Sequence, residues 1–363
     1  MTDLLANRYS ASQWQLMRAK FSDHKLAMAS LWVLGAFYTI ALLGQILAPY
    51  GTWQPSPFPF APPTRIHFFH DGHLVAPMVY ATKIELDPKT FERRIVPDKT
   101  TILPIRFFVR GAEYRWLGLV PCNVHLFGVD SSGQIAIMGT DILGRDCFSR
   151  DLVATQISCT VGLVGVFITF VLGCLIGGVS GYYGGIVDNI VQRFTEFVTC
   201  IPTIPMWMAL GAAIPSTWSN LNVYFAITII LALRSWTGLS RQVRSKLLEL
   251  KEEDYVTAAR VAGTSDWGII LTHLLPGFAS YLIVSLTLEI PRMILGETTL
   301  SFFGLGLRPP TVSWGVLLQD AQNLAAISIY PWLMFPGIMV VVCVLAFNFL
   351  GDGLRDAADP YKE

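Results

Sequence analysis

The sequence predicts an all-α polytopic membrane protein with six transmembrane helices and a small β-rich insertion between the first two. Apolar residues make up 53% of the 363 positions and charged residues only 14%, whereas a typical soluble domain has about 25% charged residues. The mean hydropathy is +0.50. Several apolar runs also reach the roughly 20 residues that a helix needs to cross the hydrocarbon, where every backbone amide must bond within its own segment.

Six runs are apolar enough to be spans. Three of them contain no charged residue: 26–47, 157–179 and 327–350. The other three, at about 186–214, 221–239 and 274–295, contain the charged residues Asp188, Arg193, Glu196, Arg234, Glu289 and Arg292. Charged groups in hydrocarbon tend to face the bundle interior or an aqueous cavity. The Arg193/Glu196 and Glu289/Arg292 spacings of three allow an ion pair on one helix face, and we interpret them as structural pairs, with substrate contact as the alternative.

Basic residues next to the spans predict the topology, because Lys and Arg near span ends resist translocation. Placing the N-terminus in the cytoplasm leaves only Arg308 in the short outer connections, and an even number of spans returns the C-terminus to the same side. We therefore expect a cytoplasmic segment at 1–25, a first span at 26–48 that is an uncleaved anchor, an outer segment at 49–151, a membrane core at 152–350 and a cytoplasmic tail at 351–363.

The outer segment has the pattern of short strands separated by Gly, Pro and Asp. After a proline-rich stretch, "RIHFFHDGHLVAPMVY" predicts two strands around Asp71-Gly72, a dipeptide suited to a hairpin turn. We interpret His67, His70 and His73 as surface residues of this hairpin and expect no metal site, because alternation along strands separates their imidazoles. Cys122 and Cys147 could form a disulfide on this side, although two free thiols are the simpler interpretation.

A polar stretch interrupts the apolar spans at about 247–273. Good helix formers fill 247–262, and Gly263 lies where a helix would stop and reverse. Asp266 is positioned to cap a second helix that enters the membrane, with Pro276 loosening it on entry. Two interpretations remain open on physical grounds: a knob that fits a cleft on another protein, or an amphipathic linker on the lipid headgroups.

Five sequence blocks resemble the permease subunits of bacterial ATP-binding-cassette (ABC) importers. "AARVAG" at 258–263, followed nine residues later by "HLLP", resembles the EAA motif, the loop that docks into the groove of the ATP-hydrolysing subunit, with Thr257 in place of the leading Glu. The others are similar to the C-type permease of dipeptide and oligopeptide importers: "GTDILGRDCFSRDL", "GYYGGIVDNIVQR", "GETTLSFFGLGLRPPTVSWGVLL" and "GDGLRDAADP". "RIHFF" and "PIRFFVRG" resemble an extended sub-branch that includes oligosaccharide and larger-peptide systems.

This resemblance implies a type I ABC importer permease fold in the bacterial inner membrane. It implies a heterodimer with a related B-type permease, two ABC ATPase subunits that bind ATP and Mg, and a substrate-binding protein on the outside. The chain itself has no G-x-x-x-x-G-K-[ST] motif, so we expect no cofactor and no catalytic residue; membrane lipid is expected as a partner and nucleic acid is not. The expected ATPase-docking residues are Asp254, Tyr255, Thr257, Ala258, Ala259, Arg260, Gly263 and Asp266. The candidate pathway or gate residues are Glu289, Arg292, Glu297, Ser301 and Phe302.

Two other classes of protein remain to be compared with the importer permease. An ion-coupled secondary transporter would show internal pseudo-repeats and unwound mid-membrane helices, and neither pattern is clear in the sequence. An intramembrane hydrolase could recruit Ser280 and His273, but no third orienting group is evident. Uptake that depends on a separate ATPase distinguishes the first class from these two.

Overall fold

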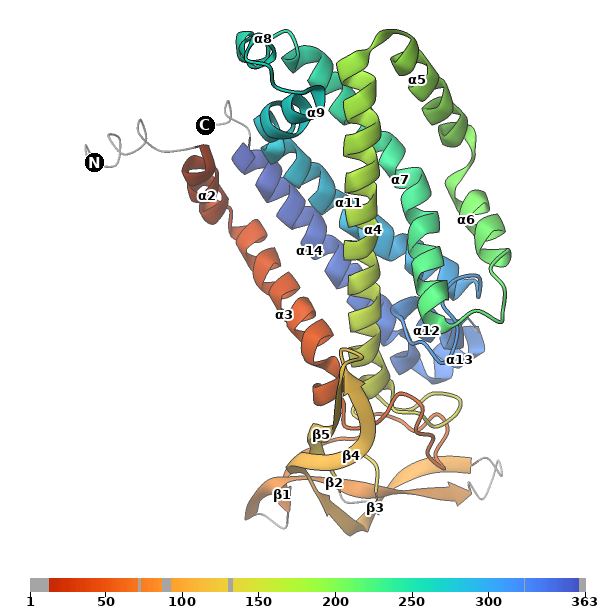
Figure 1. Ribbon diagram of the computed structural model, residues 1–363. Coiled ribbons are helices and arrows are strands. Elements are labelled where there is room, and N and C mark those ends of the chain that lie inside the picture. The colour runs from red at the N-terminus through yellow and green to blue at the C-terminus, as the bar shows by residue number, and fades with distance from the viewer. Residues whose placement is uncertain (1–12, 71–72, 87–92, 130–132, 323, 359–363) are drawn as a thin grey trace, which may run out of the picture. The chain divides into compact units, whose positions relative to one another are not determined.

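The computed structural model describes residues 13–70, 73–86, 93–129, 133–322 and 324–358, and they are mostly helical (Figure 1). Within these residues, five helices are long and apolar enough to cross a membrane. They are α3 (Lys25–Leu47), α4 (Cys147–Tyr183), α7 (Asn220–Leu250), α11 (Ala279–Phe302) and α14 (Phe335–Ala358), the last extended at its start by the 3₁₀ turn Pro331–Met334. The chain forms two compact units, one of Met1–Gly35, Thr160–Glu297 and Val342–Glu363 and the other of Ala36–Cys159 and Thr298–Val341.

In the first unit, small residues bring α4 and α7 into close contact. Gly173, Gly177 and Gly181 are spaced four apart and therefore lie on one face of α4. A Cβ added at Gly173 would lie 2.7 Å from Leu239, and one added at Gly181 would lie 2.8 Å from the carbonyl oxygen of Arg244. Only glycine permits this approach, as expected for helix packing in lipid. We call these three glycines and the facing part of α7 the glycine seam.

Several chain segments lie together at one end of the first unit. The short helix α2 (Gln13–Asp23) and the start of α3 lie beside the end of α14, because a Cβ added at Gly353 would overlap Ala27. The helices α8 (Asp254–Val261) and α9 (Asp266–Gly268) lie at this same end (Figure 1). Here Arg244 near the end of α7 also forms a bidentate ion pair with Asp188 near the start of α5 (Gly185–Cys200), with both N–O distances 2.5 Å.

One of the six predicted spans, at about 186–214, is not a single long helix. The structure divides it into α5 and α6 (Thr203–Ala212), and neither is long enough to be counted among the spanning helices. Ile201 and Pro202 separate them with extended backbone, at φ −76° and ψ 124° for Ile201. The physical reason is that a proline disfavours helical geometry in the residue before it and has no N–H to donate. The prediction of an uninterrupted apolar run overlooked this break.

Three other predicted boundaries differ from the structure. Helix α7 continues to Leu250, so the predicted helix at 247–262 is the end of α7 followed by a separate α8. The predicted span 327–350 is broken at Tyr330 before Pro331, which separates α13 (Leu324–Ile329) from the turn that leads into α14. The predicted span 274–295 is shifted, because α11 begins only at Ala279. Before it lie a π-helical turn (Ile269–Leu274) and the short α10 (Leu275–Gly277), and Phe278, with non-helical backbone, separates α10 from α11.

In the described part of the second unit, five strands form two sheets. Strands β1 (His67–His70), β2 (His73–Leu86) and β3 (Arg93–Pro104) form an antiparallel sheet in that order, while β4 (Arg106–Trp116) pairs with β5 (Val120–Gly128). His70 lies opposite His73, as a hairpin around 71–72 requires, although the two turn residues lie outside the described residues. The expected strands are therefore present, and Cys122 and Cys147 are both free thiols.

A buried ion cluster lies at the start of α4 in the second unit. The Asp141 carboxylate is 1% exposed and accepts hydrogen bonds from the backbone N–H of Leu143 and Arg145, at 2.8 and 2.9 Å. It also pairs with the guanidinium groups of Arg145, at 2.7 Å, and Arg150. Asp320, from the chain segment after α11, lies 3.6 Å from Arg150. These contacts join the start of α4 to residues more than 150 positions away in the sequence.

The neighbouring Asp146 caps α4. Its carboxylate accepts hydrogen bonds from the backbone N–H of Ser149, at 2.8 Å, and from the Ser149 hydroxyl, at 2.6 Å, which is the geometry of an N-cap residue bonded to the third helical position. Burial raises the pKa of Asp146 to about 6 against the opposing effect of these hydrogen bonds. Burial likewise raises the pKa of Asp320. The block "GTDILGRDC" thus stabilises the entry to α4.

Candidate functional site: the α8–α9 loop and a basic cavity

The polar stretch between α7 and α11 contains the two short helices α8 and α9, joined by a sharp turn. We call residues 254–268 the α8–α9 loop. Helix α8 ends at Val261, and Gly263 has φ +82°. The N–H of Gly263 donates to the carbonyl of Arg260 at 3.0 Å, and the N–H of Thr264 donates to the carbonyl of Ala259 at 3.1 Å. This pair of bonds is the Schellman motif, which satisfies the last carbonyls of a helix and favours glycine in the left-handed position. The prediction that Gly263 stops and reverses the helix is confirmed.

The cap of α9 differs from the prediction. Ser265, not Asp266, is the N-cap residue, because its hydroxyl oxygen accepts from the N–H of Gly268 at 3.2 Å. Asp266 lies one position later and accepts hydrogen bonds from the hydroxyl groups of Tyr182, at 2.7 Å, and Tyr183, at 3.2 Å. Serine and aspartate are both strong N-cap residues, so residue type alone does not tell which of the neighbours Ser265 and Asp266 caps the helix. Asp266 therefore ties the loop to the end of α4.

Another contact from α4 supports the loop. The Arg260 guanidinium lies 5.9 Å from the ring centre of Tyr182, within the range of a cation–π interaction. Both tyrosines come from the "GYYGG" sequence at 181–185. The sequence did not identify them as part of the site, because nothing in the spacing of residues 70 or more positions apart indicates their contact.

The loop has one buried face and one exposed face. Val256 is completely buried and packs in a cluster with Leu247, Ile269, Ile270 and Leu274. Of the expected docking residues, Ala259 is half-buried, while those that lie exposed are Asp254, Tyr255, Thr257, Ala258, Arg260, Gly263 and Asp266. Val261 is 84% exposed and Trp267 46% exposed. An anchored helix that presents small and apolar side chains to the outside is suited to contact another protein.

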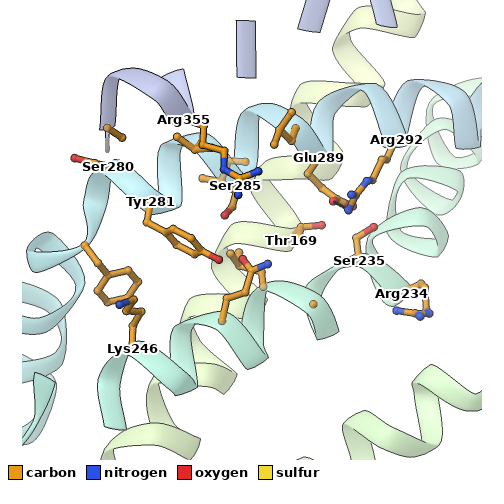
Figure 2. Close-up of a pocket in the computed structure, with 18 of the residues that line it drawn as sticks. Thr169, Arg234, Ser235, Lys246, Ser280, Tyr281, Ser285, Glu289, Arg292 and Arg355 are labelled. Atoms are coloured by element: carbon orange, nitrogen blue, oxygen red, sulfur yellow. Dashed lines mark hydrogen bonds and ion pairs between the residues drawn. The ribbon is translucent and has the colours of Figure 1, made fainter. Parts of the chain in front are cut away.

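A second feature of the first unit is a cavity of about 920 Å³ between α7, α11 and the end of α14 (Figure 2). Among the described residues, the lining includes four basic side chains, Arg234, Lys246, Arg292 and Arg355, and a single carboxylate, Glu289. Hydroxyl groups of several serines, of threonines and of Tyr281 also face it. The lining combines apolar side chains with these polar groups, and its excess of positive charge favours anionic groups.

Glu289 and Arg292 lie side by side on α11 in this cavity, facing Ser235 and Arg234 of α7 (Figure 2). The Arg292 guanidinium donates to the Glu289 carboxylate at 3.1 Å. Arg193 pairs in the same way with Glu196 at 2.9 Å, away from the cavity. Both ion pairs predicted from their spacing of three are confirmed.

The other three candidate pathway or gate residues do not line this cavity. Glu297 belongs to α11 and is completely buried. The Ser301 hydroxyl accepts from the N–H of Leu307 at 3.0 Å, and the Phe302 carbonyl accepts from the side-chain amide of Gln322. Gly304, at φ +74°, completes a tight reversal after α11. Ser301 and Phe302 thus form part of the end of the helix, and a gating role for them stays a prediction.

Comparison with known protein families matches two parts of the chain. Residues 170–362 match the family described as binding-protein-dependent transport system inner membrane component. Residues 12–63 match the N-terminal TM domain of oligopeptide transport permease C. The strands β1 to β5 lie between the two matched segments and in neither of them.

Individual relatives are transport proteins. The glutathione transport system permease protein GsiD of Pectobacterium atrosepticum is 36% identical over 248 residues, which cover 68% of this chain and 76% of that protein. The oligopeptide transport system permease protein OppC of Haemophilus influenzae is 40% identical, with coverage of 61% and 69%. Among solved structures, the MetNI methionine ABC transporter in an inward facing conformation matches with a TM-score of 0.43 and 18% identity, covering 56% of this chain and 94% of that one.

Proposed function

The chain belongs to the family of binding-protein-dependent transport system inner membrane components, and we propose that it is the C-type permease subunit of an ABC importer for peptides. Relatives named for oligopeptide and glutathione transport support this cargo class, and the resemblance of the outer segment to an extended sub-branch adds oligosaccharides as a second class. In this proposal the chain pairs with a B-type permease, and a substrate-binding protein delivers the cargo from outside.

The α8–α9 loop is the observation that carries the proposal. Its buried Val256 and its bonds to Tyr182 make it part of the same body as α4 and α7, while its outer face is exposed. A loop of this kind can enter the groove of an ATPase subunit and transmit the movement of that subunit to the membrane helices. The alternative function, an ion-coupled secondary transporter, gives no role to an exposed helix of this kind.

This proposal also sets the orientation. In the first unit, α2, the α8–α9 loop and the last turns of α14 lie at one end. If the loop meets a cytoplasmic ATPase, both chain termini are cytoplasmic. The basic residues at the same end, such as Arg244, Lys246 and Arg355, agree with the excess of Lys and Arg on the cytoplasmic side of membrane proteins.

Reconstitution tests this function. The chain is expressed with its companion permease, its two ATPases and the binding protein, and the complex is inserted into lipid vesicles. We expect accumulation of a labelled peptide only when ATP and the ATPase subunits are both present. Accumulation driven by a proton or sodium gradient without the ATPases would support the secondary transporter and contradict the proposal.

We also propose that the basic cavity forms part of the translocation pathway. The replacement Arg292→Gln removes one positive charge from the lining. We expect ATP-driven uptake of a peptide rich in acidic residues to fall about fivefold, equivalent to roughly 1 kcal/mol for a partly solvated charge, with uptake of a basic peptide unchanged or increased.

Arg193→Gln is the matched control for this measurement. It removes an arginine from an ion pair of the same spacing, with 77% of its side chain exposed, outside the cavity. Uptake by this variant is expected to equal that of the unsubstituted importer for both peptides. Equal uptake of the acidic peptide by the Arg292→Gln and Arg193→Gln variants would exclude the cavity from the pathway.

A further inference from the structure

The β4–β5 hairpin lies alongside the last turns of α3. Near its base, His125 on β5 makes a hydrogen bond of 2.5 Å between its Nδ1 and the carbonyl oxygen of Ala48, which directly follows α3. Near its tip, the Trp116 indole Nε1 donates to the carbonyl oxygen of Leu42 at 2.8 Å. All these residues belong to the second unit. The two contacts fix the direction of the hairpin: it runs back along α3 from Ala48 towards Leu42 (Figure 1).

This direction brings the hairpin tip to membrane depth. Helix α3 is one of the candidate membrane spans and ends at Leu47. Leu42 precedes that end by five residues, which corresponds to about 8 Å along the helix axis. A group beside Leu42 therefore lies at the boundary between the lipid headgroups and the acyl chains, since α3 is close to the length that crosses a hydrocarbon core of about 30 Å.

The side chains of the tip suit that depth. Leu117, Leu119 and Val120 are 43%, 82% and 52% exposed. The turn therefore exposes apolar side chains, whereas a hairpin turn that faces water usually carries polar residues. Trp116 and Arg115 adjoin the turn on β4. Tryptophan is enriched at membrane interfaces, and an arginine side chain can extend from an apolar surface to the phosphate groups.

Continuity with α3 identifies lipid as the occupant of this surface. Leu42 is itself 49% exposed on α3, so the apolar turn extends a surface of the same span that faces outward in this chain. Only the turn can enter the hydrocarbon, because the outer edges of a two-stranded ribbon carry backbone groups that need water or headgroups as partners. We propose that the tip of the hairpin, residues 117–120, inserts into the lipid leaflet at the C-terminal end of α3 and anchors the β-rich segment to the bilayer.

Depth-dependent quenching tests this anchor in the complete importer complex in lipid vesicles. The variant Leu119→Cys is labelled with a fluorophore, and Glu85→Cys on β2, an exposed residue of the same unit, is the matched control. We expect lipids with brominated acyl chains to quench the label at position 119 strongly and the label at position 85 little. Iodide in the buffer should give the reverse order.

Background labelling and folding are controlled separately. Labelling of the unsubstituted chain measures the native thiols, of which Cys200 is exposed and the other five are half-buried or buried. Val120→Cys provides a second tip position if Leu119→Cys assembles poorly. Strong iodide quenching at the tip would place it in water and overturn the proposal. Weak quenching by both agents would place it against protein, either the companion permease or the binding protein, and would overturn the proposal as well.

Discussion

Replacing Asp141 by alanine is expected to destabilise the chain by about 3–5 kcal/mol, the cost of removing one partner from a buried ion pair. Arg145 and Arg150 are 5% and 3% exposed, so neither can turn to water when the carboxylate is lost. Asp320 remains nearby, but its carboxylate oxygen lies 3.6 Å from Arg150 and 4.0 Å from Arg145. The expected observation is a large loss of monodisperse complex after mild heating in detergent, measured by size-exclusion chromatography.

The control is Glu85→Ala, which breaks an ion pair of 2.8 Å with Lys83 in which both side chains are about half exposed. Exposed pairs contribute about 0–1 kcal/mol, so this variant should resemble the unsubstituted protein. Asp141→Asn keeps acceptors for the two backbone N–H groups and should be intermediate. Equal thermal stability of Asp141→Ala and Glu85→Ala would contradict the structural role assigned to the ion cluster.

Replacing Gly263 by valine is expected to separate the permease from its ATPase without unfolding it. A Cβ added at Gly263 would meet no atom within 4 Å, so the substitution introduces no clash at that atom within the chain. The φ of +82° is nevertheless unfavourable for any L-residue with a Cβ, by about 1–2 kcal/mol, and most so for a β-branched one. The turn between α8 and α9 should therefore change shape. We expect loss of ATPase copurification and of peptide uptake.

Two variants define the cause of that effect. Gly263→Asn should retain most of the activity, because asparagine adopts left-handed backbone more readily than other residues with a side chain. Gly185→Val introduces comparable strain at φ +55°, also with no atom within 4 Å of an added Cβ, at the first residue of α5. This variant should still bind the ATPase. If Gly263→Val copurifies with the ATPase and supports normal uptake, the α8–α9 loop is not the docking element.

Local chemistry predicted the turns and pairs of this chain better than its long helices. Gly263 was expected at a reversal and has positive φ there, because few other residues adopt that backbone geometry. The Glu289–Arg292 pair followed from the pitch of a helix. By contrast, hydropathy averaged over 186–214 concealed the break at Pro202, and an apolar run alone does not show where a helix ends.

Contacts between distant segments could not be derived from the sequence. The hydrogen bonds from Tyr182 and Tyr183 to Asp266 and the proximity of Arg150 to Asp320 join residues far apart along the chain, and no periodicity encodes them. The places of the candidate pathway or gate residues could not be derived for the same reason. Glu289 and Arg292 line the cavity, whereas the Ser301 hydroxyl accepts a hydrogen bond from the turn after α11, and a pathway or gating role for these residues stays a prediction.

The glycine seam has a mechanical consequence for transport. Side chains between two packed helices can change rotamer and so accommodate small displacements of one helix against the other. At Gly177 and Gly181 there is no side chain to do so, and α4 packs directly on the backbone of α7. Helix α4 is an uninterrupted helix of 37 residues, about 55 Å long, and its last turn bears the tyrosines that hold Asp266. We therefore expect a displacement of the α8–α9 loop to move α4 and α7 together as one rigid body, with little relative motion between the two helices.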